Sequence, residues 1–263
     1  MEIIDYGICR LSVVSVRKDP ADTTEQVTQL LFGDHYEVIE ISKDKKWLKI
    51  RINFDQYTGW INTKQHQVIA KEYYDHINNA EFKITTDITA SLLYNKSPLM
   101  VLLGSIIPIS SAELFKMEEQ FAFNGEAKNV GQKREFEYLR SIAQKYLNAP
   151  YQWGGKNPFG IDCSGFTQMV FKIVGYRLSR DAAQQAMQGK SIKDLGEAKP
   201  GDLLFFQNHE SKVTHTGILI GPEKVIHASG KVRIDHINEE GILNLETKIY
   251  THQLSGIRRI LSE

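Results

Sequence analysis

A polar segment at residues 124–131 (NGEAKNVG) divides the chain, because it carries two glycines and shows neither helical nor strand periodicity. Such a composition is typical of a boundary between domains that pack independently. The full length of 263 residues exceeds the usual size of one compact domain, so each side of this boundary is long enough to bury its own core. The residue patterns on the two sides also differ.

Short strand patterns fill the N-terminal half. They occur at residues 11–16 and 36–41, and again where Leu48, Ile50 and Ile52 alternate with basic residues. These strands are too short for anything larger than a compact barrel. Residues 81–123 show similar strand patterns, with β-branched runs at 84–89 and 99–109 after a helical connector near 71–79. We therefore predict one barrel in residues 1–70 and a second barrel, with the linker, in residues 71–130.

The C-terminal half, residues 131–263, mixes helical and strand patterns. Apolar residues at helical spacing run from Phe136 to Leu147 and stop before Pro150, which cannot continue a helix. A second amphipathic helix is predicted over residues 164–174, ending at Gly175. Strands are predicted at 202–206, 214–220, 224–228 and 231–236. The fold class is therefore α+β.

Charge and cysteine content limit the partners. Lys plus Arg and Asp plus Glu are equal at 32 each, which argues against a nucleic-acid or membrane-surface binder and favours a small or peptidic ligand. Only Cys9 and Cys163 are present, far apart, so they indicate neither a disulfide framework nor a zinc ribbon. Acidic residues at Glu2 and Asp5 occupy the place of a signal peptide's basic region, and we expect a cytoplasmic protein.

Cys163 is the candidate nucleophile. It lies at the predicted start of the second helix, where unpaired backbone N–H groups and the helix dipole favour a thiolate, so we expect a lowered thiol pKa. Ser164 and Gly165 are small enough for a substrate carbonyl to approach, with the Cys163 backbone N–H as oxyanion donor. The alternative is a buried structural cysteine.

A cysteine nucleophile needs a base, and His215 lies in one predicted strand with His227 in the next. If residues 221–223 form the loop between them, Gly217 faces His227 and His215 becomes its diagonal neighbour on the same face. His227 would then orient His215. A two-residue loop would instead place the histidines on opposite faces of the sheet.

A zinc site built from Cys163, His215, His227 and Asp162 is the competing interpretation of these residues. Metal ligands usually cluster at short spacings such as CxxC, which this chain lacks, so we expect no metal. The remaining histidines are expected to be solvated or packing residues: His35, His66, His76, His209, His236 and His252.

Six motifs in order resemble the NlpC/P60 family of cell-wall cysteine peptidases. They are residues 151–155 (YQWGG), 162–166 (DCSGF), 180–181 (RD), 200–206 (PGDLLFF), 215–218 (HTGI) and 226–228 (IHA). The resemblance covers about residues 132–260. It implies a reduced papain-like catalytic domain with Cys163 as nucleophile, His215 as base and His227 as the third polar residue. Tyr151 would line the site near the oxyanion.

Residues 25–33 and 55–60 resemble the bacterial SH3-like domain of the YkfC-type branch, which contains γ-D-glutamyl-L-diamino acid endopeptidases. The resemblance implies two small SH3-like β-barrels before the catalytic domain. It also implies cleavage of murein peptides with a free N-terminal L-Ala during cell-wall recycling. We expect a monomer that needs no cofactor.

The free amine of such a substrate predicts a set of binding residues. An ammonium group prefers carboxylate, hydroxyl and aromatic neighbours, which Asp162, Glu25, Tyr57 and Ser164 would supply if the first barrel packs over the cleft. Tyr151 and Trp153 would form an adjoining wall. Equally, Tyr57 fits a core aromatic and Glu25 a solvated charge.

Two other functions fit the same residues. One is a cell-wall binding module whose catalytic domain is vestigial, which the intact set Cys163, His215 and His227 disfavours. The other keeps the thiol chemistry but makes the protein an amidase or acyltransferase.

Overall fold

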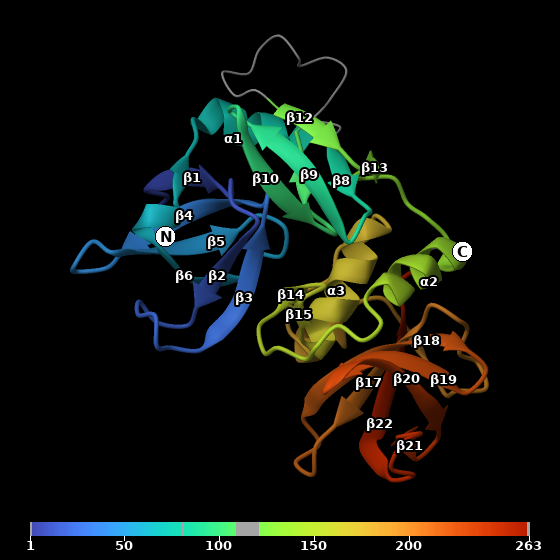
Figure 1. Cartoon of the computed structure of the whole chain (residues 1–263). Coiled ribbons are helices and arrows are strands. Elements are labelled where there is room, and N and C mark those ends of the chain that lie inside the picture. The colour runs from blue at the N-terminus through green and yellow to red at the C-terminus, as the bar shows by residue number, and fades with distance from the viewer. Residues whose placement is uncertain (1, 80–81, 109–120, 262–263) are drawn as a thin grey trace. The chain divides into compact units, whose positions relative to one another are not determined.

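The computed structural model of the chain describes residues 2–79, 82–108 and 121–261 (Figure 1). The chain divides into two compact units: residues 1–132 with 154–157, and residues 133–153 with 158–263. The predicted run 99–109 and the second predicted barrel reach into residues 109–120, which lie outside the described residues. Each unit is described by itself below.

The first part of unit 1 is an antiparallel sheet with the strand order β3-β2-β6-β5-β4-β1-β7. In β5, Leu48, Ile50 and Ile52 face the core as their alternation predicts. The elements are β1 (Asp5–Ile8), β2 (Val13–Arg17), β3 (Gln26–Leu31), β4 (His35–Ile41), β5 (Trp47–Ile52), β6 (Thr58–Asn62), a 3-10 turn (Thr63–Gln65) and β7 (Gln67–Val68).

The second part of unit 1 forms two three-stranded sheets, with orders β10-β9-β12 and β11-β8-β13. Phe32 from the first part lies fully buried in the core of the second, against Leu92 and Val101. This shared core explains why residues 1–132 cluster as one unit. The elements are α1 (Lys71–Asn79), β8 (Lys83–Thr85), β9 (Thr89–Tyr94), β10 (Ser97–Leu102), β11 (Ile106–Ile107), β12 (Phe121–Asn124) and β13 (Ala127–Asn129).

The polar segment 124–131 is not an irregular linker throughout, which corrects the sequence-based expectation. Its residues Ala127–Asn129 form β13, which pairs with β8 in antiparallel register. A strand of three residues is too short to display alternation, so no periodicity was visible. The two units separate after Gln132 instead.

A short stretch from the C-terminal half of the sequence belongs to unit 1. Its strand β14 (Lys156–Asn157) lies by Gln29, whose side-chain oxygen accepts hydrogen bonds from the Lys156 backbone N–H and the Asn157 amide, both at 2.9 Å. Gly154 has a φ of +72°, and a Cβ there would lie 2.3 Å from the Gln26 carbonyl oxygen. Only glycine fits this approach.

Unit 2 contains the helix and strands that carry the candidate site. Helix α3 packs against β18 and β19 and is buried along its whole length. The two helices and four strands predicted from sequence are all present. The elements are α2 (Phe136–Lys145), β15 (Gly160–Ile161), α3 (Cys163–Ile173), α4 (Ala182–Gln185), β16 (Lys190–Ile192), β17 (Leu203–Gln207), β18 (Val213–Gly221), β19 (Lys224–Ser229), β20 (Lys231–Asn238), β21 (Gly241–Leu243) and β22 (Tyr250–Arg259).

The sheet of unit 2 has the order β16-β22-β17-β18-β19-β20-β21, and a further pairing of β21 with β22 closes six of its strands into a barrel. Leu219, Val225 and Ile237 contribute to the apolar core inside it. Strand alternation places His215, His227 and Asp235 on this same inner face. The barrel interior therefore has an apolar part and a polar part.

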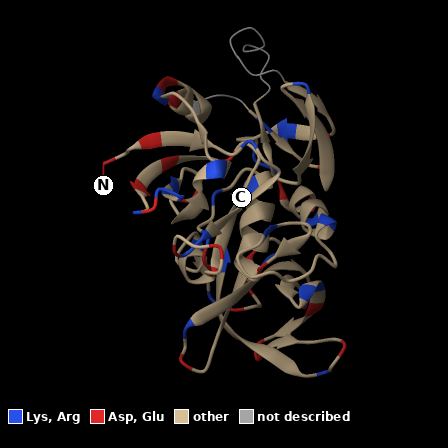
Figure 2. Ribbon diagram, turned by 60° about the vertical axis from the view of Figure 1, so that its left-hand side comes forward, with Lys and Arg blue, Asp and Glu red and all other residues tan. Residues whose placement is uncertain are grey.

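Positively and negatively charged residues are mixed along the chain. Figure 2 shows basic and acidic positions interspersed along the ribbon, in keeping with the equal counts of the two. Among the described residues, every helix is too short or too polar to cross a bilayer.

Candidate active site

Cys163 is the first residue of α3, and Asp162 caps the helix by accepting the Gly165 backbone N–H at 2.6 Å. The first N–H groups of a helix have no partner within it, so they are available to an oxyanion. The Cys163 thiol lies 4.0 Å from the carbonyl oxygen of Thr214 on β18. The sulfur therefore lies against the strand segment that carries His215.

The protonation of Cys163 differs from the sequence-based expectation. Burial, with a smaller contribution from the charge of Asp162, raises the pKa of the thiol to about 12, although a backbone hydrogen bond from Thr216 acts in the opposite direction. Only 6% of Cys163 is exposed, so desolvation outweighs the helix terminus. A thiol with a raised pKa is neutral at rest and needs a base before it can act as a nucleophile.

His215 and His227 meet as predicted. His215 Nε2 lies 2.9 Å from His227 Nδ1, and the two rings are perpendicular. Gly217 pairs with His227 in the register of β18 and β19.

The loop that produces this register is nevertheless different from the predicted one. Gly221 already pairs with Lys224, which leaves a two-residue turn, Pro222 and Glu223. A register shift between Leu219 and Gly221 inserts one extra residue, Ile220, as a bulge. Because of this bulge, His215 and His227 lie on the same face of the sheet, which a two-residue turn alone would not allow.

Asp235 extends the pair into a row of three buried side chains. Its carboxylate lies 3.1 Å from His227 Nε2. Arg233 holds the carboxylate with two hydrogen bonds, at 2.6 and 3.0 Å, and the Leu245 backbone N–H donates a third at 2.9 Å. Asp235 was not identified from the sequence.

A signal for Asp235 was present, however. His227 pairs with Arg233 across β19 and β20, which makes Asp235 its diagonal neighbour on the same face. The rule that joined His215 to His227 therefore also joins His227 to Asp235 in the next hairpin.

His215 is held in its neutral form. Burial lowers its pKa well below the ordinary value, and the neighbouring His227 and His252 lower it further. The His252 ring stacks on His215 with a centroid distance of 4.0 Å, so it is one of the packing residues expected among the remaining histidines. Burial also lowers the pKa of His252, to about 4. A neutral imidazole at position 215 can accept the thiol proton.

We expect Gly217→Ala to disturb this geometry. A Cβ at residue 217 would lie 2.7 Å from Val225 Cγ2 and 3.0 Å from His227 Cβ, so His227 must shift. A misplacement of this kind is expected to lower kcat by roughly 10- to 100-fold. Gly221→Ala on the same strand is the control, because a Cβ there meets nothing within 4 Å. Equal activity of the two variants in a peptide-cleavage assay would contradict the assigned role of the register.

The predicted substrate residues Asp162 and Ser164 lie in a buried polar network beside Cys163. The Arg180 guanidinium donates to both Asp162 carboxylate oxygens, at 3.0 and 2.5 Å, and to the Ser164 hydroxyl at 3.0 Å. These contacts give both residues a structural role at the start of α3. A contact with substrate stays a prediction for each.

The other predicted binding residues occupy separate environments. Burial raises the pKa of Tyr151 to about 12, and the charges of Cys163 and Asp162 contribute, which places Tyr151 near the nucleophile. Trp153 is 61% exposed. In unit 1, Glu25 is exposed with Lys18 3.4 Å away, and Tyr57 is half-buried against the barrel core. Substrate binding by these four residues also stays a prediction.

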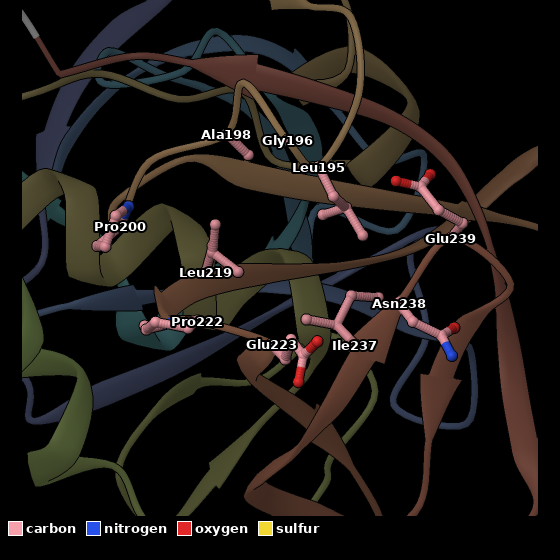
Figure 3. A pocket seen from close by; sticks show the side chains of 11 residues that line it. Leu195, Gly196, Ala198, Pro200, Leu219, Pro222, Glu223, Ile237, Asn238 and Glu239 are labelled. Atoms are coloured by element: carbon pink, nitrogen blue, oxygen red, sulfur yellow. The ribbon is translucent and has the colours of Figure 1, made fainter.

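A cavity of about 490 Å³ lies around the turn between β18 and β19, and Cys163, His215 and His227 are not among the described residues that line it. Figure 3 shows the side chains of Leu195, Leu219 and Ile237 pointing into it. It is therefore separate from the nucleophile. The described part of the chain contains no group of three or more His, Cys, Asp or Glu side chains placed to hold a metal ion.

Comparisons with known proteins agree with this arrangement. Residues 148–255 match the NlpC/P60 family, and residues 16–65 match the bacterial dipeptidyl-peptidase SH3 domain. The second match confirms the prediction of an N-terminal SH3-like domain. A second such domain in residues 71–130 stays a prediction.

Two relatives match most of the chain. A gamma-D-glutamyl-L-lysine dipeptidyl-peptidase from Bacillus subtilis (strain 168) is 30% identical over 257 residues, covering 90% of this chain and 81% of that protein. Dipeptidyl-peptidase 6 from Lysinibacillus sphaericus is 27% identical over 249 residues, covering 84% and 88% respectively.

A solved structure shares the fold. An NlpC/P60 family protein from Bacillus cereus ATCC 10987 aligns with a TM-score of 0.79 at 22% identity, covering 97% of this chain and 99% of that one.

Proposed function

The chain belongs to the NlpC/P60 family, and from this premise we propose that it is a cysteine endopeptidase cleaving the bond between γ-D-Glu and the diamino acid in murein peptides. The observation that carries the chemistry is the position of Cys163 at the start of α3, against the strand that holds His215. The names of the relatives support a peptidoglycan-derived peptide as substrate.

The geometry supports a two-step mechanism. Because His215 Nε2 is hydrogen-bonded to His227, the other ring nitrogen of His215, Nδ1, is the one available to Cys163. His215 removes the thiol proton as sulfur attacks the γ-D-Glu carbonyl, and backbone N–H groups at the start of α3 bind the oxyanion. His215 then protonates the leaving amine, and water hydrolyses the thioester to release the enzyme.

Selection of the substrate rests on its free N-terminal L-Ala. We propose that Asp162 and Ser164 of unit 2 bind the ammonium group, while Tyr151 and Trp153 line the adjoining wall. A contribution from Glu25 and Tyr57 stays a prediction from the sequence. Carboxylates, hydroxyls and aromatic rings are the neighbours that an ammonium group prefers. This specificity suits short peptides released from murein, and we propose a cytoplasmic, monomeric recycling enzyme.

The test is hydrolysis of L-Ala-γ-D-Glu-L-Lys and of its meso-diaminopimelate analogue, each compared with an N-acetylated copy. We expect cleavage at the γ-D-Glu bond, with kcat/KM at least about 100-fold lower for the acetylated peptide because the ammonium contacts are lost. The acetylated peptide is the matched control, since it keeps the scissile bond unchanged.

Each other outcome has a definite meaning. Equal cleavage of free and acetylated peptides would remove the proposed amine specificity but keep the peptidase. No cleavage of either peptide by folded protein would instead favour the binding-module interpretation, and transfer of the acyl group to an added amine would favour an acyltransferase. Loss of activity with a chelator would contradict metal-independent thiol chemistry.

A further inference from the structure

We propose that Asp235 is a positioning residue that fixes where the protons lie on both His227 and His215, so that His215 presents a lone pair to Cys163. The inference deepens the proposed function and rests on its assignment of Cys163 as nucleophile. It starts from the buried row formed by His215, His227 and Asp235.

The carboxylate of Asp235 is ionised and acts only as an acceptor. It is 1% exposed, and burial alone would raise its pKa, but hydrogen bonds from His227 and Arg233 outweigh burial and hold the pKa well below its ordinary value. The two bonds from Arg233 and the one from Leu245 occupy the other lone pairs. The oxygen facing His227 therefore requires a hydrogen on His227 Nε2.

Proton positions on the two rings follow from this requirement. A neutral imidazole has one donor and one acceptor nitrogen, so a hydrogen on His227 Nε2 leaves a lone pair on His227 Nδ1. That lone pair, 2.9 Å from His215 Nε2, accepts the hydrogen of His215. His215 Nδ1 is then the unprotonated nitrogen, which general-base catalysis needs.

The same proton positions are compatible with the state in which the thiol proton has been transferred to His215. When the thiol proton moves from Cys163 to His215 Nδ1, His215 becomes an imidazolium whose Nε2–H still donates to His227. The proton returns from Nδ1 to the leaving amine, so no proton has to pass along the row to Asp235. The carboxylate contributes by orientation and by its negative charge near the cation.

Asp235→Asn should reverse the direction of the hydrogen bonds along the row, because asparagine has nearly the same size as aspartate but can donate a hydrogen. The asparagine amide can donate a hydrogen bond to His227 Nε2, which moves the hydrogen of His227 to Nδ1 and that of His215 to Nδ1. His215 would then present N–H to the thiol instead of a lone pair. Reversing the histidine tautomer in a triad costs about 10⁴ in kcat, and through an intervening ring we expect a loss of roughly 10³-fold.

A double-mutant cycle separates this role from a structural one. In His227→Leu, the side chain has neither a donor nor an acceptor, so residue 235 can no longer set the proton position on His215, and adding Asp235→Asn should change kcat by less than about 3-fold. Asp202→Asn is the matched control, because Asp202 is also 1% exposed, is held by Arg259 at 2.8 and 2.7 Å, and has no histidine partner among the described residues. Its kcat should stay within about 3-fold of wild type.

A readout that needs no substrate completes the test. Nitrogen-15 chemical shifts of the histidine rings should show the proton of His215 on Nε2 in wild type and on Nδ1 in Asp235→Asn. Unchanged tautomers, or an equal loss of kcat in the wild-type and His227→Leu backgrounds, would overturn the proposal. If wild type cleaves no peptide, the proposed function fails, while the ring shifts still decide the role of Asp235.

Discussion

Replacing Cys163 by alanine is expected to lower kcat for cleavage of L-Ala-γ-D-Glu-L-Lys by roughly 10⁵-fold, as removal of the nucleophile does in triad enzymes. The sulfur forms the covalent bond to substrate, and the described structure places its thiol beside the strand of the base. KM should change little, because alanine removes one buried atom that contributes mainly to the reacting state.

The second cysteine supplies the control. Cys9 is as buried as Cys163 but lies in unit 1, where its thiol donates to the Leu11 carbonyl at 3.3 Å. Cys9→Ala should therefore lower stability while leaving kcat unchanged. Both variants are measured by single-turnover cleavage and by thermal unfolding. Residual activity of Cys163→Ala above about 1% of wild type would contradict the covalent mechanism.

Arg180→Met is expected to lower the free energy of unfolding by about 3–5 kcal/mol, the largest stability effect of any single change we predict. The side chains of Arg180 and Asp162 are 1% and 7% exposed, and the substitution leaves the Asp162 carboxylate buried without its cation. The Gly165 backbone N–H and the Ser164 hydroxyl still donate to the carboxylate, at 2.6 and 3.4 Å, but hydrogen bonds from neutral groups compensate a buried charge only in part. Urea unfolding measures the change.

The decrease in the free energy of unfolding should be smaller when the charges of Asp162 and Arg180 are removed together. The double variant Asp162→Asn with Arg180→Met leaves no uncompensated charge, so it should be more stable than Arg180→Met alone. Lys18→Met tests an exposed pair, Lys18 with Glu25, and should change stability by less than about 1 kcal/mol. A double variant as unstable as the single one would show that the loss comes from packing of the long side chain.

The sequence allowed most of the site to be predicted. Spacing and helix pattern placed Cys163 at a helix start, and alternation along two strands placed His215 beside His227. The predicted turn was one residue too long, but the bulge at Ile220 adds the missing residue to the strand. The predicted register is therefore confirmed, although the local structure that produces it differs. A bulge leaves no reliable pattern in a single sequence, because it depends on how neighbouring strands pack.

Other features depend on contacts between distant segments. The stacking of His252 on His215 requires β22 to lie beside β17, a pairing across about 50 residues that periodicity does not reveal. The sequence predicted a lowered thiol pKa, whereas the structure gives a raised one. The helix terminus can be predicted from the sequence, but the burial of Cys163 cannot. Both features depend on tertiary structure rather than on local propensity.

The return of residues 154–157 to unit 1 has a consequence for synthesis on the ribosome. Unit 1 lacks β14 when residue 132 emerges, and the backbone and amide groups that bind Gln29 follow about 25 residues later. At usual translation rates this delay is roughly 1 to 5 s, long compared with the formation of a small barrel. The N-terminal unit therefore completes its fold only after the ribosome has begun the catalytic half, while the strands that carry both histidines are still untranslated.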